Sequence, residues 1–143
     1  MDNPTIANGT QLTPEDILGI TQTSQDYIGS WYAADEERMR ACLHPELVKR
    51  TIVHDTQRDN WKLSRALDVQ MMVDRTHQGG GSDVPEPDRT EQITILDAFR
   101  HVASVKVLSH DYVDYLHIAK FDHRWLIVHA LWELRSGEIN ANS

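Results

Sequence analysis

The sequence predicts an α+β domain in which N-terminal helices cover one face of a strongly curved, C-terminal antiparallel sheet. Apolar residues recur at helical spacing up to about His77, whereas from Glu91 onward they alternate with polar residues, as in strands. The four alternating segments are joined by very short connections, which is typical of hairpins. The chain has 143 residues, of which 40% are apolar, enough for one sizeable core. We therefore expect a single domain over 1–143, with residues 1–12 and 136–143 as tails.

The first helix is predicted from Pro14 to about Ala34. Thr13 is a favourable N-cap, Pro14 suits the first helical position, and the acidic residues that follow lie near the positive end of the helix dipole. Three- and four-residue steps then place a broad, mainly apolar face on one side of this helix, formed by Ile17, Ile20, Ser24, Tyr27 and Trp31. This face predicts that the helix packs on the sheet.

The middle of the chain alternates between short elements. Asp35 is expected to cap a second helix over residues 36–42, and the β-branched stretch at 47–53 predicts a strand followed by a polar loop. Ser64 is expected to start a third helix that fades near His77. The triple glycine and the prolines that follow predict a surface loop from His77 to Thr90.

Four strands are predicted at 92–99, 102–109, 112–121 and 125–134. With tight turns between them, simple alternation divides their side chains between two faces. The face expected to lie under the helices carries Leu96, Ala98, Ala103, Val105, Val107, Asp114, Leu116, Ile118, Trp125, Ile127, His129 and Leu131. The other face carries Ile95, Asp97, Phe99, Ser104, Lys106, Tyr115, His117, Val128, Ala130 and Trp132. Because this outer face mixes aromatic with charged residues, we expect a homodimer to form through it.

Asp114 and His129 are the candidate catalytic residues. Alternation places them diagonally on adjacent strands of the inner face, where a carboxylate can orient an imidazole or either group can move a proton. A buried hydrogen bond without turnover is the alternative interpretation, because structural networks pair the same groups. The enzyme hypothesis therefore stays open, with Asp114 as base and His129 or Tyr115 as its partner.

The ligand-binding candidates are apolar or aromatic. The first helix contributes Tyr27, Trp31 and Tyr32, whose rings suit stacking on a flat ligand, and the other candidates are Met71, Leu116 and Ile127. Core packing is the alternative role for all of them. No cofactor is predicted.

Composition excludes several classes of function. The net charge of −8 and the scattered basic residues disfavour nucleic acid as a partner, and no stretch is apolar enough to predict a membrane span. Cys42 is the single cysteine, which excludes an intrachain disulfide and favours a cytoplasmic location. The eight histidines include no helical pair at i, i+4 spacing, so no metal site is predicted.

Several stretches together resemble the putative lumazine-binding group of the nuclear transport factor 2-like superfamily. They are His44-Pro45-Glu46-Leu47-Val48-Lys49-Arg50, Ile95-Leu96-Asp97, Ala103-Ser104-Val105-Lys106-Val107, Asp114-Tyr115-Leu116-His117-Ile118-Ala119-Lys120 and Trp125-Leu126-Ile127-Val128. Two turns depart from the pattern of this group, since Arg100-His101 stands in place of Gly-Asn and His123 in place of Gly.

The resemblance implies a cone in which helices and a curved sheet enclose a pocket, commonly in a homodimer. Relatives with this fold include isomerase-like and cyclase-like enzymes as well as binding proteins, so the fold alone does not assign an activity. Three hypotheses follow. The chain is a small-molecule-binding domain with an apolar conical pocket, a cofactor-independent lyase or isomerase that moves a proton next to a carbonyl, or a structural dimerisation module.

Overall fold

The computed structural model describes residues 5–6 and 12–141. Its helices are α1 (Pro14–Ala33), α2 (Glu36–Cys42) and α3 (Val69–His77), with a short 3₁₀ helix, η1 (Glu86–Asp88). Its strands are β1 (Thr5–Ile6), β2 (Leu43–Asp55), β3 (Asn60–Leu63), β4 (Gln92–Phe99), β5 (Val102–Leu108), β6 (Tyr112–Phe121) and β7 (Arg124–Leu134).

The first two helices begin at the residues that their caps predict. The Thr13 hydroxyl accepts a hydrogen bond from the Asp16 amide at 3.1 Å, and the Asp35 carboxylate accepts one from the Arg38 amide at 3.1 Å. Ala34 ends α1 in the left-handed conformation, with φ of 54°. Both helices are therefore set by local signals in the sequence.

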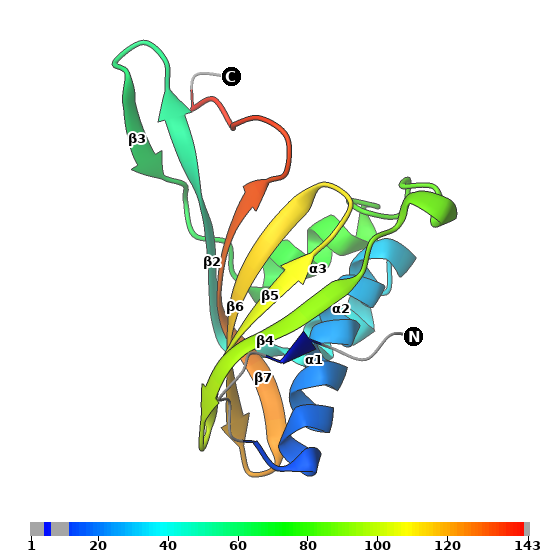
Figure 1. The fold of residues 1–143 in the computed structure, drawn as a ribbon. Coiled ribbons are helices and arrows are strands. Elements are labelled where there is room, and N and C mark those ends of the chain that lie inside the picture. Colours follow the sequence, from blue (N-terminus) through cyan, green and yellow to red (C-terminus); the bar gives the residue numbers. More distant parts are fainter. Residues whose placement is uncertain (1–4, 7–11, 142–143) are drawn as a thin grey trace.

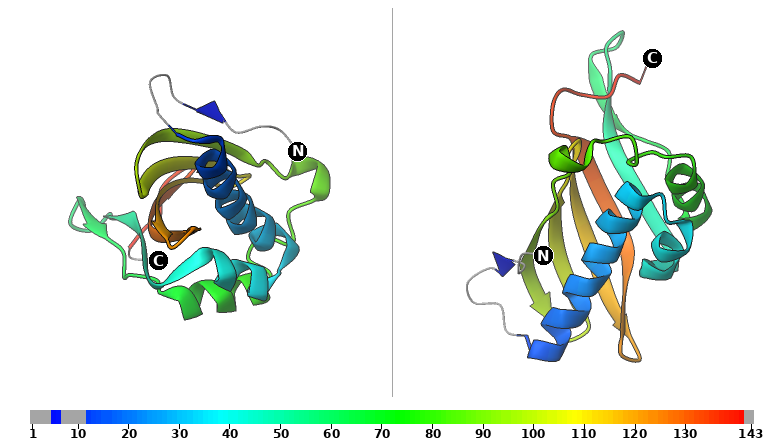
Figure 2. Two further views of the ribbon diagram at one scale, coloured as in Figure 1. Left: turned by 90° about the horizontal axis from the view of Figure 1, so that it is seen from below. Right: turned by 90° about the vertical axis from the view of Figure 1, so that its right-hand side faces the viewer.

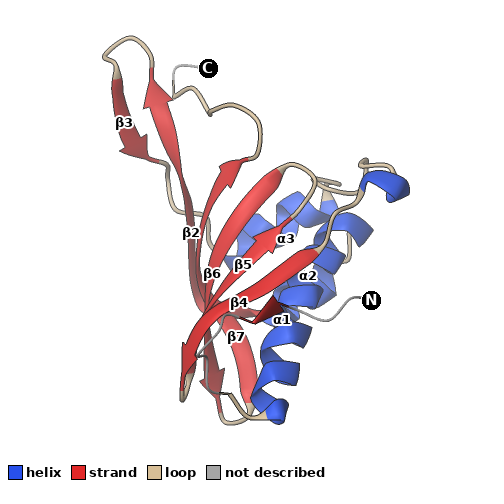
Figure 3. Ribbon diagram, in the orientation of Figure 1, coloured by secondary structure: helices blue, strands red, loops and turns tan. Residues whose placement is uncertain are grey.

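The sheet has the strand order β1-β4-β5-β6-β7-β2-β3 (Figures 1 and 3). The four C-terminal strands form the antiparallel meander that the sequence predicts. The sheet as a whole is mixed, because β2 lies parallel to β7 and β1 lies parallel to β4. The fold class is confirmed as α+β, with three helices packed on one curved sheet.

The middle of the chain differs from the prediction. β2 runs from Leu43 to Asp55, and the expected polar loop instead turns into β3, which pairs back onto β2. Ser64 does not start a helix, because its amide and hydroxyl bond the backbone of Thr51 on β2. The third helix starts at Val69, where the Asp68 carboxylate accepts from the Met71 amide at 2.9 Å.

The sheet curls around α1, so that the helices lie on its concave side (Figure 2). The core fills the space between these layers, and its most deeply buried hydrophobic side chains are Ile20, Met39, Met72, Ile95, Val105, Val107, Leu116, Ile118 and Ile127. Gly19 lets α1 approach the sheet closely, because a Cβ there would lie 2.5 Å from the Trp125 ring. The Thr23 hydroxyl donates to the Trp125 carbonyl at 2.6 Å on the same side.

Two β-bulges change which side chains face the core. Ile95 pairs with Val105 and Asp97 with Ser104, which leaves Leu96 as an extra residue in β4. Ile95 is consequently fully buried and Leu96 is 36% exposed, the reverse of the predicted assignment. A bulge inserts one unpaired residue and thereby shifts the alternation on one side of it.

The second bulge lies in β7, where Ile127 pairs with Ile118 and His129 with His117, so that Val128 is the extra residue. Beyond it, Ala130 and Trp132 face the helices. His129 and Leu131 lie on the outer face, which corrects the predicted positions of all four.

The β2–β3 hairpin extends beyond the rest of the sheet as an arm (Figure 1). Residues 136–141, expected in a tail, run beside it: the His54 amide donates to the Ile139 carbonyl, and the Ala141 amide donates to the His54 carbonyl, both at 2.8 Å. At the other end of the chain, Thr5 and Ile6 pair with β4, and residues 1–4, 7–11 and 142–143 lie outside the described part.

Candidate functional site

A cavity of about 70 Å³ lies between the helices and the concave face of the sheet. Its lining residues are Tyr27, Ile28 and Trp31 of α1, Met39 of α2, Lys49 of β2, Leu67 just before α3, Met72 and Arg75 of α3, Ser109 between β5 and β6, Tyr112 and Asp114 of β6, and Trp132 of β7. Most of these side chains are apolar or aromatic, and the few polar groups among them determine what the cavity can recognise.

The polar centre of the cavity is formed by Tyr27, Lys49 and Asp114. The Tyr27 hydroxyl donates a hydrogen bond to Oδ1 of Asp114 at 3.0 Å and accepts one from the Lys49 ammonium. The Lys49 Nζ lies 3.5 Å from the same Oδ1. The side chains of Lys49 and Asp114 are only 12% and 5% exposed, so the two opposite charges balance each other inside the protein.

Burial raises the pKa of the Tyr27 phenol well above its ordinary value, and the nearby Asp114 charge raises it further. The phenol therefore stays protonated and donates to the carboxylate. The Lys49 ammonium also lies 5.1 Å from the centre of the Tyr27 ring and 5.8 Å from that of the Trp132 ring, within reach of cation–π attraction.

Trp132 brings a buried hydrogen-bond donor to the cavity wall. Its Nε1 is shielded from solvent, and no hydrogen-bond acceptor for it occurs in the described part of the chain. Its ring packs edge-on against Tyr112, with centroids 5.1 Å apart. Leaving a buried N–H without an acceptor costs about 1–3 kcal/mol.

The exposed side of the cavity is formed by Trp31, Arg75 and Tyr112. Trp31 and Tyr112 are partly exposed and meet edge-to-face with centroids 6.4 Å apart, and the Arg75 side chain is exposed. The loop that contains Gly80 and Gly81 packs on Trp31, because a Cβ at Gly80 would lie 2.2 Å from the Trp31 ring and one at Gly81 would lie 2.9 Å from the Trp31 carbonyl oxygen. The loop therefore holds the indole in place at the edge of the cavity.

Asp114 is buried at the cavity, but the predicted pairing of Asp114 with His129 is wrong. The bulge at Val128 turns His129 to the outer face, where it lies opposite His117 with ring centroids 5.8 Å apart. Tyr115, the other predicted partner, is 50% exposed on the outer face. Tyr27 and Lys49 occupy the place beside Asp114 instead.

Two of the six predicted ligand-binding residues, Tyr27 and Trp31, line the cavity. The hydroxyl of Tyr32 instead bonds two backbone groups, donating to the Thr90 carbonyl at 2.8 Å and accepting from the His110 amide at 2.9 Å. Met71 is half-buried beside the core, while its neighbour Met72 reaches the cavity. The other two candidates, Leu116 and Ile127, are packed in the core.

Sequence reasoning missed Lys49, Arg75 and Trp132. Lys49 stands in a strand whose pairing to β7 joins residues about eighty positions apart, and Trp132 follows a bulge. One signal in the sequence was available for Lys49. It lies in a mostly β-branched strand, and a basic side chain that faces inward from such a strand needs a partner.

The outer face carries a second, wider groove of about 430 Å³, lined by Asp97, Ala98, Phe99, Val102, Ala103, Ser104, His117, Ile118, Ala119, Val128 and His129. Several large apolar side chains are exposed on this face, including Phe99 (65%) and Leu131 (53%). The groove contains two imidazoles and one carboxylate, and its chemistry is distinct from that of the inner cavity.

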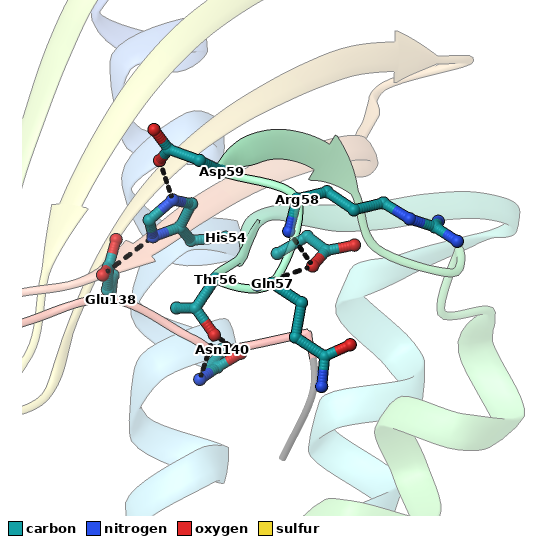
Figure 4. Close-up of polar contacts among 8 residues, drawn as sticks. His54, Thr56, Gln57, Arg58, Asp59, Glu138 and Asn140 are labelled. Carbon is teal, nitrogen blue, oxygen red and sulfur yellow. Dashed lines mark hydrogen bonds and ion pairs between the residues drawn. The ribbon is translucent and has the colours of Figure 1, made fainter.

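A third polar group lies at the arm, where the chain end meets the β2–β3 hairpin (Figure 4). His54 Nδ1 is 3.0 Å from a Glu138 carboxylate oxygen, and Nε2 is 3.1 Å from one of Asp59. The His54 ring also stacks on Trp61, with centroids 4.6 Å apart. These contacts attach residues 136–141 to the arm.

Within residues 5–6 and 12–141, no group of three or more His, Cys, Asp or Glu side chains is arranged to hold a metal ion. No helix in this part of the chain is long and apolar enough to cross a membrane.

Solved proteins described as nuclear transport factor 2-like or cystatin-like share this fold of helices packed on a curved sheet. Residues 15–133 match the family described as "Putative lumazine-binding", and the chain belongs to this family. No curated protein matches the sequence.

Solved structures support the same fold. A nuclear transport factor 2-like protein of unknown function from Shewanella baltica is 16% identical, with a TM-score of 0.62 over 89% of this chain and 100% of that one. Another from Methylobacillus flagellatus is 21% identical, with a TM-score of 0.63 over 89% and 98%. A cystatin-like protein from Nostoc punctiforme is 10% identical, with a TM-score of 0.59 over 90% and 98%. At these identities the likeness concerns the fold alone.

Proposed function

We propose that this protein binds a small molecule in the inner cavity, at Tyr27, Lys49 and Asp114. The observation that carries the proposal is a balanced pair of buried charges in a mostly apolar and aromatic cavity wall. A structural core gains little from such a pair, because replacing a buried ion pair by apolar residues is often neutral or stabilising. A binding site uses the same groups to orient a ligand.

The cavity volume limits how a ligand enters. An enclosed apolar cavity of about 150 Å³ holds one benzene ring, and this cavity measures about 70 Å³. A two-ring pteridine of the kind named by the family would therefore insert one edge, and its remainder would lie outside against Trp31 and Tyr112.

Native mass spectrometry of the purified protein and a fragment screen by ¹H–¹⁵N NMR test this proposal. The tryptophan indole signals distinguish the cavity from the arm. Trp31 and Trp132 line the cavity, whereas Trp61 lies on the arm. Binding is expected to shift the Trp31 and Trp132 indole signals and to leave Trp61 unchanged. A screen in which shifts occur only at the outer groove, or not at all, would refute the proposal.

Proton transfer is a second candidate function of the same cavity. In the described part of the chain, both contacts of the Asp114 carboxylate fall on Oδ1, so Oδ2 remains for a substrate. We infer that such a reaction would use Oδ2 as the base, with Tyr27 and Lys49 as the neighbouring hydrogen-bond donors. Turnover of a carbonyl substrate that survives Asp114→Asn would exclude this role.

We also propose a homodimer that forms through the outer sheet face. Phe99, Val102, Tyr115 and Leu131 are each at least 50% exposed there, and Phe99 and Val102 line the 430 Å³ groove. Burial of exposed aromatic and aliphatic anchors between polar neighbours is how stable interfaces gain energy.

Sedimentation of the wild type is expected to give a dimer, and Leu131→Glu a monomer. The matched control is Leu18→Glu on α1, where the leucine is 68% exposed on a different surface. A monomeric wild type, or equal effects of the two substitutions, would count against the outer face as the interface.

A further inference from the structure

Resting on the binding function proposed above, we infer that the group entering the cavity is an amide-type group, a carbonyl oxygen beside an N–H. The carbonyl would accept a hydrogen bond from Lys49, and the N–H would donate to Asp114. Carboxamides, lactams and cyclic imides share this chemistry.

The acceptor half of the site is the carboxylate oxygen Oδ2 of Asp114. An ionised carboxylate only accepts hydrogen bonds, and each of its two oxygens has capacity for more than one. Tyr27 and Lys49 both approach Oδ1. Within residues 5–6 and 12–141 no side chain bonds Oδ2, which belongs to a residue that lines the cavity and is left for a donor from the ligand.

The donor half is the Lys49 ammonium. It has three N–H groups and no acceptor. One bonds the Tyr27 hydroxyl and one side faces Asp114, which leaves a donor for a ligand oxygen. Trp132, whose buried N–H has no acceptor in the described part of the chain, lines the same wall.

Charge balance selects a neutral group. Lys49 and Asp114 cancel each other where solvent hardly reaches, so a carboxylate or an ammonium entering this cavity would bring one uncompensated charge. Desolvating an unpaired ion is costly, whereas a neutral amide supplies both a donor and an acceptor without net charge. Arg75 at the edge is exposed, so solvent screens its charge.

The volume of the cavity also favours an amide group. The three heavy atoms of an amide group fit in about 70 Å³, whereas a complete ring does not. The ring or chain that carries the amide would then contact Trp31 and Tyr112 on the exposed side of the cavity.

Three isosteric probes test the inference: benzamide, benzoate and benzamidinium. They share one ring and one planar head group, but present respectively a donor with an acceptor, two acceptors, or donors alone. Titrations of the wild type, followed by calorimetry and by the Trp132 indole signal, are expected to show benzamide binding at least ten-fold more tightly than both ions.

The variant Asp114→Asn is expected to reverse this preference. It leaves the Lys49 cation without its counter-charge, so benzoate should now bind more tightly than benzamide. The matched control His129→Ala, in the outer groove, should keep the wild-type order. Urea unfolding verifies that each variant is folded, and if Asp114→Asn does not fold, the wild-type comparison decides alone.

The possible failures are distinguishable. If either ion binds to the wild-type cavity as tightly as benzamide, the amide inference is overturned while small-molecule binding stands. If fragments of another class shift the Trp132 indole signal and benzamide does not, the amide inference is likewise overturned and small-molecule binding stands. If no probe or fragment shifts a cavity signal, the proposed function itself fails.

Discussion

Lys49 places a positive charge beside the buried Asp114 carboxylate, and the substitution Lys49→Met removes this charge while keeping most of the side-chain volume. Removing one partner of a buried ion pair costs about 3–5 kcal/mol, because the remaining charge is left uncompensated. For a chain of 143 residues the entropy of unfolding is about 0.3 kcal/mol/K near the midpoint. The expected loss therefore lowers Tm by about 10–17 °C.

Urea unfolding followed by tryptophan fluorescence measures this loss. The double variant Lys49→Met/Asp114→Asn should be more stable than Lys49→Met alone, because no uncompensated charge remains. The control Lys106→Met, on the outer face, should change the free energy of unfolding by no more than about 0.5 kcal/mol. A loss below about 1 kcal/mol for Lys49→Met, or strict additivity of the two single substitutions, would refute the reasoning.

Three further predictions concern other parts of the molecule. Gly81→Ala places a Cβ 2.9 Å from the Trp31 carbonyl oxygen, so it should lower stability by about 1–3 kcal/mol and shift the Trp31 indole signal; an unchanged NMR spectrum would contradict this packing. His123→Gly relieves a residue with φ of 116°, outside the usual left-handed range, and should raise stability by about 1 kcal/mol in thermal unfolding, whereas a lower Tm would show that the turn is not strained. Hydrogen bonds that the His54 ring donates to the carboxylates of Glu138 and Asp59 raise the pKa of His54, so their stabilisation is present below the unfolded pKa of about 6.5 and is lost as pH rises through the higher folded pKa. Amide exchange at the chain end, corrected for its intrinsic pH dependence, should become less protected over that interval in the wild type but not in His54→Gln.

The sequence predicted the elements that depend on local interactions. The starts of α1 and α2 follow from Thr13 and Asp35, whose side chains reach amides three residues ahead. The four C-terminal strands follow from alternation and short turns, and their bounds agree with the structure to within about one residue. β3 was missed because its four residues, Asn60–Leu63, are all exposed and too few to predict a strand by alternation, and pairing with β2 makes them a strand.

The candidate site was only partly predictable. Tyr27 and Trp31 are marked by the apolar face of α1, and Asp114 by its position among apolar neighbours. Lys49 reaches Asp114 because β2 lies parallel to β7, a pairing between distant segments that no local pattern encodes. The same holds for the contact between residues 136–141 and the arm.

By itself, the sequence determined the class of fold, the order of its helices and main strands, and the presence of one acidic residue on the buried side of the sheet. The tertiary structure decided which groups surround that residue. One inserted residue at Val128 turned His129 to the outer face and Trp132 to the inner face, because side chains alternate with a period of two and a single extra residue reverses them. The position of such a bulge depends on packing between strands, so periodicity within one strand does not reveal it.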